Sequence, residues 1–218
     1  MRTFICALAI AAAFPILGCK NMSSPFNPSR DATGQPAPSA TQAMAAQAGL
    51  TTFQGLVDAK NHAALGFTSP EDVRRARLAE PMPIFLIRLD ALQRFTEETN
   101  PDTLLMDARR ALYPVEVDQR IATSLTVTQH DDGWRATDFG NSAVARAVTR
   151  FRSDPGDFIV HVPALKAYFV GRRTEGRLTL TPVMEDPRFG LPAGEALPAE
   201  RVLAALKEAA QGYNGLPQ

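Results

Sequence analysis

The densest group of residues that could bind a metal is His130-Asp131-Asp132. A metal site needs about three such ligands converging on one ion. Consecutive side chains at a hairpin tip point apart, and Asp131-Asp132-Gly133 also matches a tight turn between two strands. We therefore predict a turn at these residues and no bound metal or other cofactor.

Acid–base chemistry could come from His161, which lies between Val160 and Val162 on a predicted strand. It could act as a general base if a pocket surrounds it. A histidine packed in a strand is the simpler expectation. His62, in a predicted helix, is expected to be exposed or packed at an edge.

Nucleophilic and glycosidic chemistry have weaker support. The sequence contains no G-x-S-x-G, Walker loop, H-E-x-x-H or C-x-x-C motif. Asn141-Ser142 lies where a strand should pass into a helix, and we expect it to cap that helix. Glu97, Glu98 and Asp102 could act as paired carboxylates, but they share one predicted loop and are expected to be solvated. We therefore predict no catalytic residue.

Four aromatic residues on predicted strands could line a groove for a peptide or a glycan: Tyr113, Trp134, Tyr168 and Phe169. Aromatic side chains on alternating strands more often belong to the core. The sequence favours the core and leaves the groove as the alternative.

Cys19 ends an N-terminal segment in which Arg2 precedes an uncharged run from Phe4 to Leu17. The run is shorter than the roughly 20 apolar residues of a membrane-spanning helix and has the length of a signal-peptide core. With Ile16-Leu17-Gly18-Cys19, residues 1–20 resemble the bacterial lipoprotein signal peptide and its lipobox. The resemblance implies removal of residues 1–18, lipid on Cys19 and anchoring to a membrane. Lys20, where many inner-membrane lipoproteins carry Asp, implies the outer membrane, with the protein facing the periplasm.

Two alternatives to this resemblance are a secretory signal cut after a small residue such as Ala13 and an uncleaved buried helix in a cytosolic protein. Cys6 leaves with the signal and lipid occupies Cys19, so the mature chain would have no disulfide and no free thiol.

Composition narrows the class of protein. The 218 residues carry 23 Lys and Arg against 23 Asp and Glu. A neutral chain lacks the basic surface that neutralises phosphates, so no nucleic-acid partner is expected. Residues 19–47 are rich in Ser, Pro, Ala and Gln, which predicts a lipidated, disordered tether. Residues 48–218 are long enough for one folded domain.

The domain should belong to the α+β class, as an antiparallel meander packed on one face by helices. Strands are predicted over 84–89, 111–117, 120–129, 134–139, 157–162, 166–172 and 177–183, from alternating or continuous apolar runs. Helices are predicted over 50–65, 69–79, 143–151 and 198–211, with a short turn at 91–95. Residues 182–198 carry four prolines and should form an irregular surface strap.

These expectations favour a non-enzymatic envelope lipoprotein that binds a protein or peptide partner, with a sheet edge as the candidate binding surface. The alternatives are an enzyme acting on cell-wall or lipid material, with a site around His161 or His130, and a structural envelope lipoprotein.

Overall fold

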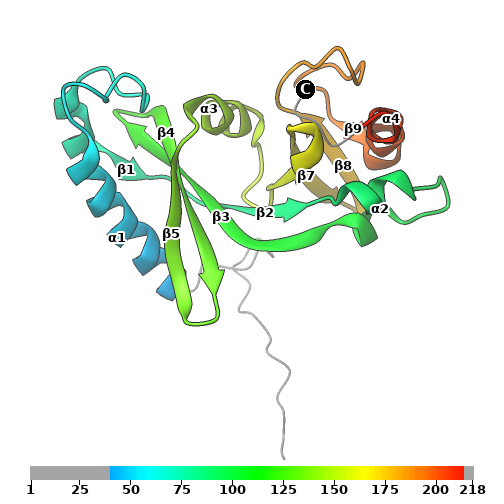
Figure 1. Cartoon of the computed structure of the whole chain (residues 1–218), viewed down its shortest axis with the longest axis horizontal. Helices are drawn as coiled ribbons and strands as arrows, with labels where there is room; N and C mark the ends of the chain where they lie inside the picture. The colour runs from blue at the N-terminus through cyan, green and yellow to red at the C-terminus, as the bar shows by residue number, and fades with distance from the viewer. Residues whose placement is uncertain (1–39, 214–218) are drawn as a thin grey trace, which may run out of the picture.

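The computed structural model describes residues 40–213 as one mixed sheet with helices packed against it (Figure 1). The sheet order is β5-β4-β3-β2-β6-β7-β8-β9, and the short strand β1 also pairs with β3. All pairings are antiparallel except that of β2 with β6. The predicted α+β class is confirmed.

The elements have the following bounds. The helices are α1 (Ala40–Leu56), α2 (Leu89–Gln93), α3 (Ser142–Phe151) and α4 (Ala199–Gln211), with 3-10 turns η1 (Pro70–Arg75), η2 (Pro101–Leu104) and η3 (Pro163–Leu165). The strands are β1 (Arg77–Leu78), β2 (Met82–Leu86), β3 (Met106–Val117), β4 (Arg120–His130), β5 (Gly133–Gly140), β6 (Phe158–Val162), β7 (Ala167–Thr174), β8 (Arg177–Pro182) and β9 (Leu197–Pro198).

The predicted meander is present in β3, β4 and β5. Asp118 and Gln119 both have positive φ, as a two-residue hairpin turn requires, and Gly133 has a φ of 125° after the second turn. The β3–β4 register pairs Tyr113 with Leu125 and Val115 with Thr123. Neighbouring side chains of β4 therefore point to opposite faces of the sheet, as the two-residue alternation in its sequence predicted.

Helices cover both faces of the sheet, which corrects the expectation of one covered face. Leu112 belongs to the cluster that packs against Val144 and Val148 of α3, whereas its neighbours Ala111 and Tyr113 pack with Leu50 and Phe53 of α1. Neighbouring strand residues point to opposite faces, so α1 and α3 lie on opposite sides. Figure 1 shows α1 and α4 at the two ends of the molecule, with α3 between them.

Helix α1 begins at Ala40, so the folded part extends into residues 40–47, which were predicted to belong to the tether. Ala46 is completely buried, and Leu50 and Phe53 lie against the sheet. This segment has few large apolar residues, but alanine has the highest helix propensity and its small side chain permits close packing. The predicted disorder is therefore wrong for residues 40–47, while residues 19–39 lie outside the described part.

Two predicted helices end earlier than expected. Helix α1 ends at Leu56, where the Asn61 side chain donates to the Leu56 carbonyl at 2.7 Å, and turns follow to Gly66. The predicted helix over 69–79 is the 3-10 turn η1. It ends because Arg77 and Leu78 pair with β3 as β1. The predicted N-terminal contact is present, since the Asp72 carboxylate accepts from the Ser69 amide at 3.1 Å.

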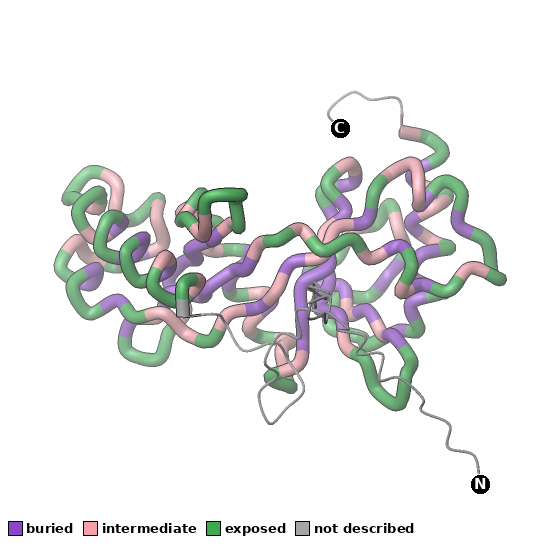
Figure 2. Tube along the Cα trace, turned by 90° about the horizontal axis from the view of Figure 1, so that it is seen from below, coloured by how far each residue is buried: buried purple, intermediate pink, exposed green. Residues whose placement is uncertain are grey.

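The buried residues run along the whole length of the sheet in three clusters (Figure 2). One cluster lies under α1, one under α3, and the largest lies between α2, α4 and strands β6 to β8. Among residues 40–213, no helix is long and apolar enough to cross a membrane.

Candidate functional site

The site best defined by geometry is formed by His161 of β6 and Tyr168 of β7. The antiparallel register places them directly opposite each other. Their rings stack with centroids 4.1 Å apart and planes inclined by 5°. Both side chains lie on the α3 side of the sheet, because Ile159 and Val170, two residues away on their own strands, belong to the α3 cluster.

The surroundings keep His161 neutral. Burial, reinforced by the positive charge of Arg110, lowers the pKa of His161 to about 4. Burial also raises the pKa of Tyr168 above its usual value. The neutral imidazole can accept a proton, but its low pKa makes it a weak base at neutral pH. The pair is therefore better suited to apolar contact and hydrogen bonding than to proton transfer.

A partly open pocket of about 140 Å³ adjoins this pair, and Tyr168 lines it. Its apolar residues are Ala167, Tyr168, Phe169, Pro182, Met184, Phe189 and Leu191. Charged residues Lys166, Glu185 and Asp186 also line it. The lining is therefore mixed, with seven apolar and three charged residues.

The outer wall of the pocket is the strap between β8 and β9, which is held by several polar contacts. The Arg188 guanidinium pairs with Asp186 at 2.6 Å and donates to the Leu165 carbonyl at 3.0 Å. The Gly194 amide donates to the Pro182 carbonyl at 2.9 Å. These contacts bring Phe189 and Leu191 back onto the sheet, where Leu191 is 5% exposed.

The pocket has the size of a side chain. Its volume is well below the roughly 300–1,000 Å³ of pockets for small-molecule ligands. Met184, one of its lining residues, is 44% exposed and so can be reached from outside. An apolar side chain of a protein partner would fit this pocket and contact Met184.

The structure separates the four aromatic candidates. Tyr168 and Phe169 line the pocket, so they are the two that meet at a candidate groove. Tyr113 is buried under α1, and burial raises its pKa to about 12. Trp134 packs at the edge of the same cluster. The expectation that these residues belong mainly to the core is confirmed for Tyr113 and Phe169, which are 4% and 2% exposed.

The remaining candidates lie apart from the pocket. His130, Asp131 and Asp132 are exposed at the β4–β5 turn, which was predicted there, and Asp132 pairs with Arg135. In residues 40–213, no three His, Cys, Asp or Glu side chains gather as a metal site would require.

The other two predicted groups have structural contacts. The Asn141 side chain accepts from the Val144 amide at 3.2 Å, which confirms its capping role. Asp102 pairs with Arg173 at 2.7 Å, while Glu97 and Glu98 lie in the turns between α2 and η2. Cys19 lies outside the described residues.

The strap residues Met184, Phe189 and Leu191 were missed as site residues. The four prolines of this segment predicted an irregular strap, and a strap is present. The available signal was two large apolar residues, Phe189 and Leu191, in a segment expected to be at the surface. Their position depends on Arg188 reaching Leu165, a contact between residues 23 positions apart.

The ion pair between Asp157 and Arg172 has a structural role. Asp157 is completely buried and binds Arg172 through both carboxylate oxygens, each at 2.7 Å. Burial acts to raise the pKa of Asp157, but Arg172 and the amides of Ser153 and Asp154 outweigh it and keep the pKa below its usual value. The pair fixes the start of β6 against β7.

No protein-family model, curated protein or solved structure matches this chain. The class defined by fold and geometry is therefore an α+β domain with a side-chain-sized pocket next to a stacked His–Tyr pair.

Proposed function

We propose that the chain is a bacterial envelope lipoprotein whose α+β domain binds a protein or peptide partner. Lipid on Cys19 would anchor it to the membrane, and Lys20 favours the outer membrane. The lipobox-like end of the N-terminal apolar run supports this anchoring.

The observation that carries the binding proposal is the pocket at Tyr168. It has the volume of a side chain, and apolar residues line it together with the charged residues Lys166, Glu185 and Asp186. Binding of this kind places an apolar anchor in the pocket and surrounds it with polar contacts. A membrane anchor adds affinity by raising the local concentration of the domain near an envelope partner.

The chain offers a matched test, because Met184 and Met106 are both 44% exposed and only Met184 lines the pocket. A photoreactive amino acid would be placed at either position in the full chain, in living cells, and cross-linked proteins identified by mass spectrometry. We expect a discrete partner from position 184 that position 106 does not capture.

Substitution gives the second arm of this test. Met184→Asp should remove co-purification of the partner, and Met106→Asp should leave it unchanged. Both sites are exposed, so neither change should disturb folding. Identical products from positions 184 and 106, or a partner retained by Met184→Asp, would contradict binding at the pocket.

A second candidate is an enzyme acting on cell-wall or lipid material, favoured by the contact of His161 with the pocket residue Tyr168. Turnover of such a substrate by the purified chain would support it. His161→Gln should then abolish turnover while leaving the thermal unfolding temperature near that of the wild type.

A further inference from the structure

Strand β5 forms an open edge of the sheet. Within residues 40–213 it pairs with β4 and with no other strand. Every second residue of such a strand directs its N–H and C=O away from the neighbouring strand. In Figure 1, β5 lies in front of β4 and β3 with no other element drawn across it. These backbone groups are available to another strand.

The sequence of β5 is chemically self-complementary. Reading Gly-Trp-Arg-Ala-Thr-Asp-Phe-Gly from both ends pairs glycine with glycine, aromatic with aromatic and Arg135 with Asp138. An antiparallel copy in this register would place Trp134 opposite Phe139 and Arg135 opposite Asp138. By symmetry each of these pairs would occur twice.

The side chains of each pair also lie on the same face of the sheet. Trp134 and Phe139 both pack on the α1 side. Arg135 and Asp138 lie opposite Thr128 and Thr126 of β4, which share the other face. A β-bulge at this point adds Thr137 to β5 and brings residues three apart onto one face.

We propose that two copies of this chain pair antiparallel along β5, forming one continuous sheet across a two-fold axis. An axis perpendicular to the sheet keeps each face continuous, so the aromatic pairs meet on one side and the ion pairs on the other. The edge is distant from the pocket, since β4, β3, β2 and β6 lie between β5 and β7.

Charges and bulges on edge strands also serve to prevent pairing. That role requires only charge, whereas here opposite charges are placed to meet in one antiparallel register. Arg135 already pairs with Asp132 of its own chain, and both side chains of that pair are more than 60% exposed. Arg135 can therefore exchange this partner for Asp138 of a second copy at little cost.

The test is the dissociation constant of the dimer of the full chain, measured by sedimentation equilibrium in one mild detergent. A two-strand interface is small, so we expect a dissociation constant on the order of micromolar. Arg135→Asp and Asp138→Arg each place like charges opposite one another at two positions and should weaken the dimer about tenfold or more. Combining the two substitutions restores opposite charges and should restore the dimer.

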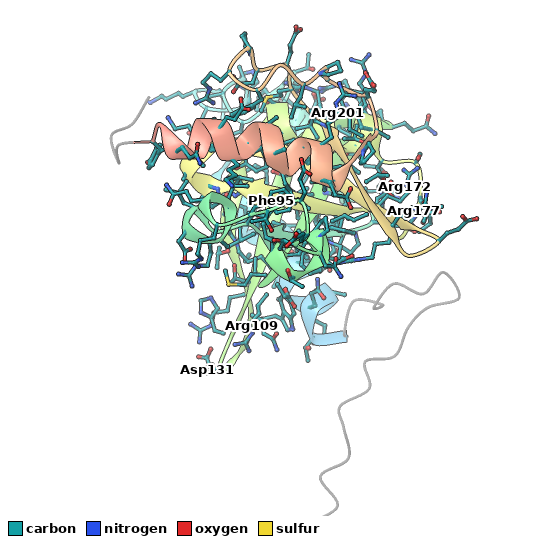
Figure 3. The ribbon with its side chains drawn as sticks, turned by 90° about the vertical axis from the view of Figure 1, so that its right-hand side faces the viewer. Phe95, Arg109, Asp131, Arg172, Arg177 and Arg201 are labelled. Atoms are coloured by element: carbon teal, nitrogen blue, oxygen red, sulfur yellow. The ribbon has the colours of Figure 1, made fainter. Side chains whose placement is uncertain are left out.

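Arg201→Asp and Glu208→Arg, both exposed on α4, repeat the same charge changes away from the edge. Figure 3 shows Arg201 on α4 at the opposite side of the molecule from Asp131 in the β4–β5 turn. These controls should leave the dissociation constant unchanged. A monomeric wild-type chain, single reversals that do not weaken the dimer, or a double reversal that does not restore it would overturn the proposal.

Discussion

His161 shows how strongly one residue depends on the strand opposite it. The alternating sequence predicted both His161 and Tyr168 on strands, but not that they face each other. Their pairing depends on the turn through η3, where Lys166 adopts a left-handed conformation with a φ of 53°. Cross-strand register is set by turn geometry, which the apolar pattern of each strand does not specify.

The low pKa of His161 predicts a loss of stability in mild acid. The folded protein binds fewer protons at this side chain than the unfolded chain between its folded pKa of about 4 and the ordinary value of 6.5. Stability should therefore fall as the pH drops from 6.5 to 4, by an amount on the order of 2–3 kcal/mol. Urea unfolding at a series of pH values measures this slope.

His161→Phe keeps a ring against Tyr168 and removes the titration, so its unfolding free energy should change less over this interval. His130→Phe, at the exposed end of β4, is the matched control and should keep the wild-type slope. Equal slopes in wild type and His161→Phe would show that His161 does not carry this pH dependence.

At the scale of elements, α1 shows where a sequence pattern is informative and where it is not. The meander was predictable because Leu125 and Val127 alternate with the polar residues Ser124, Thr126 and Thr128 in β4, and because the turns carry Asp and Gly. The start of α1 was not predictable from large apolar residues, because it packs through small ones. Gly49 lies so close to the sheet that an added Cβ would be 2.5 Å from the Ala136 Cβ and 2.9 Å from a Leu125 methyl carbon.

Replacing either of two glycines in α1 with alanine should therefore change the stability of the protein in opposite directions. Gly49→Ala should destabilise the protein by about 1–3 kcal/mol, because helix and strand must separate to accept the methyl group. Gly55→Ala has open space around it and should be neutral or stabilising by up to about 1 kcal/mol, since alanine favours the helix. Thermal or urea unfolding of both variants measures the difference.

Gly55→Ala also controls for the loss of glycine flexibility in the unfolded chain, which affects both variants. Equal stability of the two variants would contradict the close approach of α1 to β5.

At the scale of the whole molecule, one sheet joins two halves of the chain, and the sequence did not predict that their strands pair. Parallel pairing of β2 with β6 links strands more than 70 residues apart, with the meander and α3 inserted between them. Such pairings follow from the packing of all the elements together, and no local pattern encodes them. The pocket depends on the same kind of contact, because Arg188 holds the strap against the turn before β7.

The corrected start of α1 also changes the expected geometry of anchoring. With Ala40 in a helix, the proposed tether comprises residues 20–39, and a flexible chain of that length has a mean reach of about 25 Å. The domain would then remain close to the membrane surface, with α1 as its nearest helix along the chain.

Membrane attachment is therefore predicted to depend on one atom, the sulfur of Cys19. Cys19→Ala should move the domain out of the lipid-modified fraction, because a chain without its acyl groups loses about 0.8 kcal/mol for each buried CH₂. Metabolic labelling with a fatty-acid analogue, followed by membrane fractionation, measures both attachment and location. Lys20→Asp is the matched variant. It should keep the fatty-acid label and shift the protein toward the inner membrane. Fatty-acid label on Cys19→Ala would exclude the proposed lipid site, and an unlabelled wild-type chain would exclude the lipoprotein assignment itself.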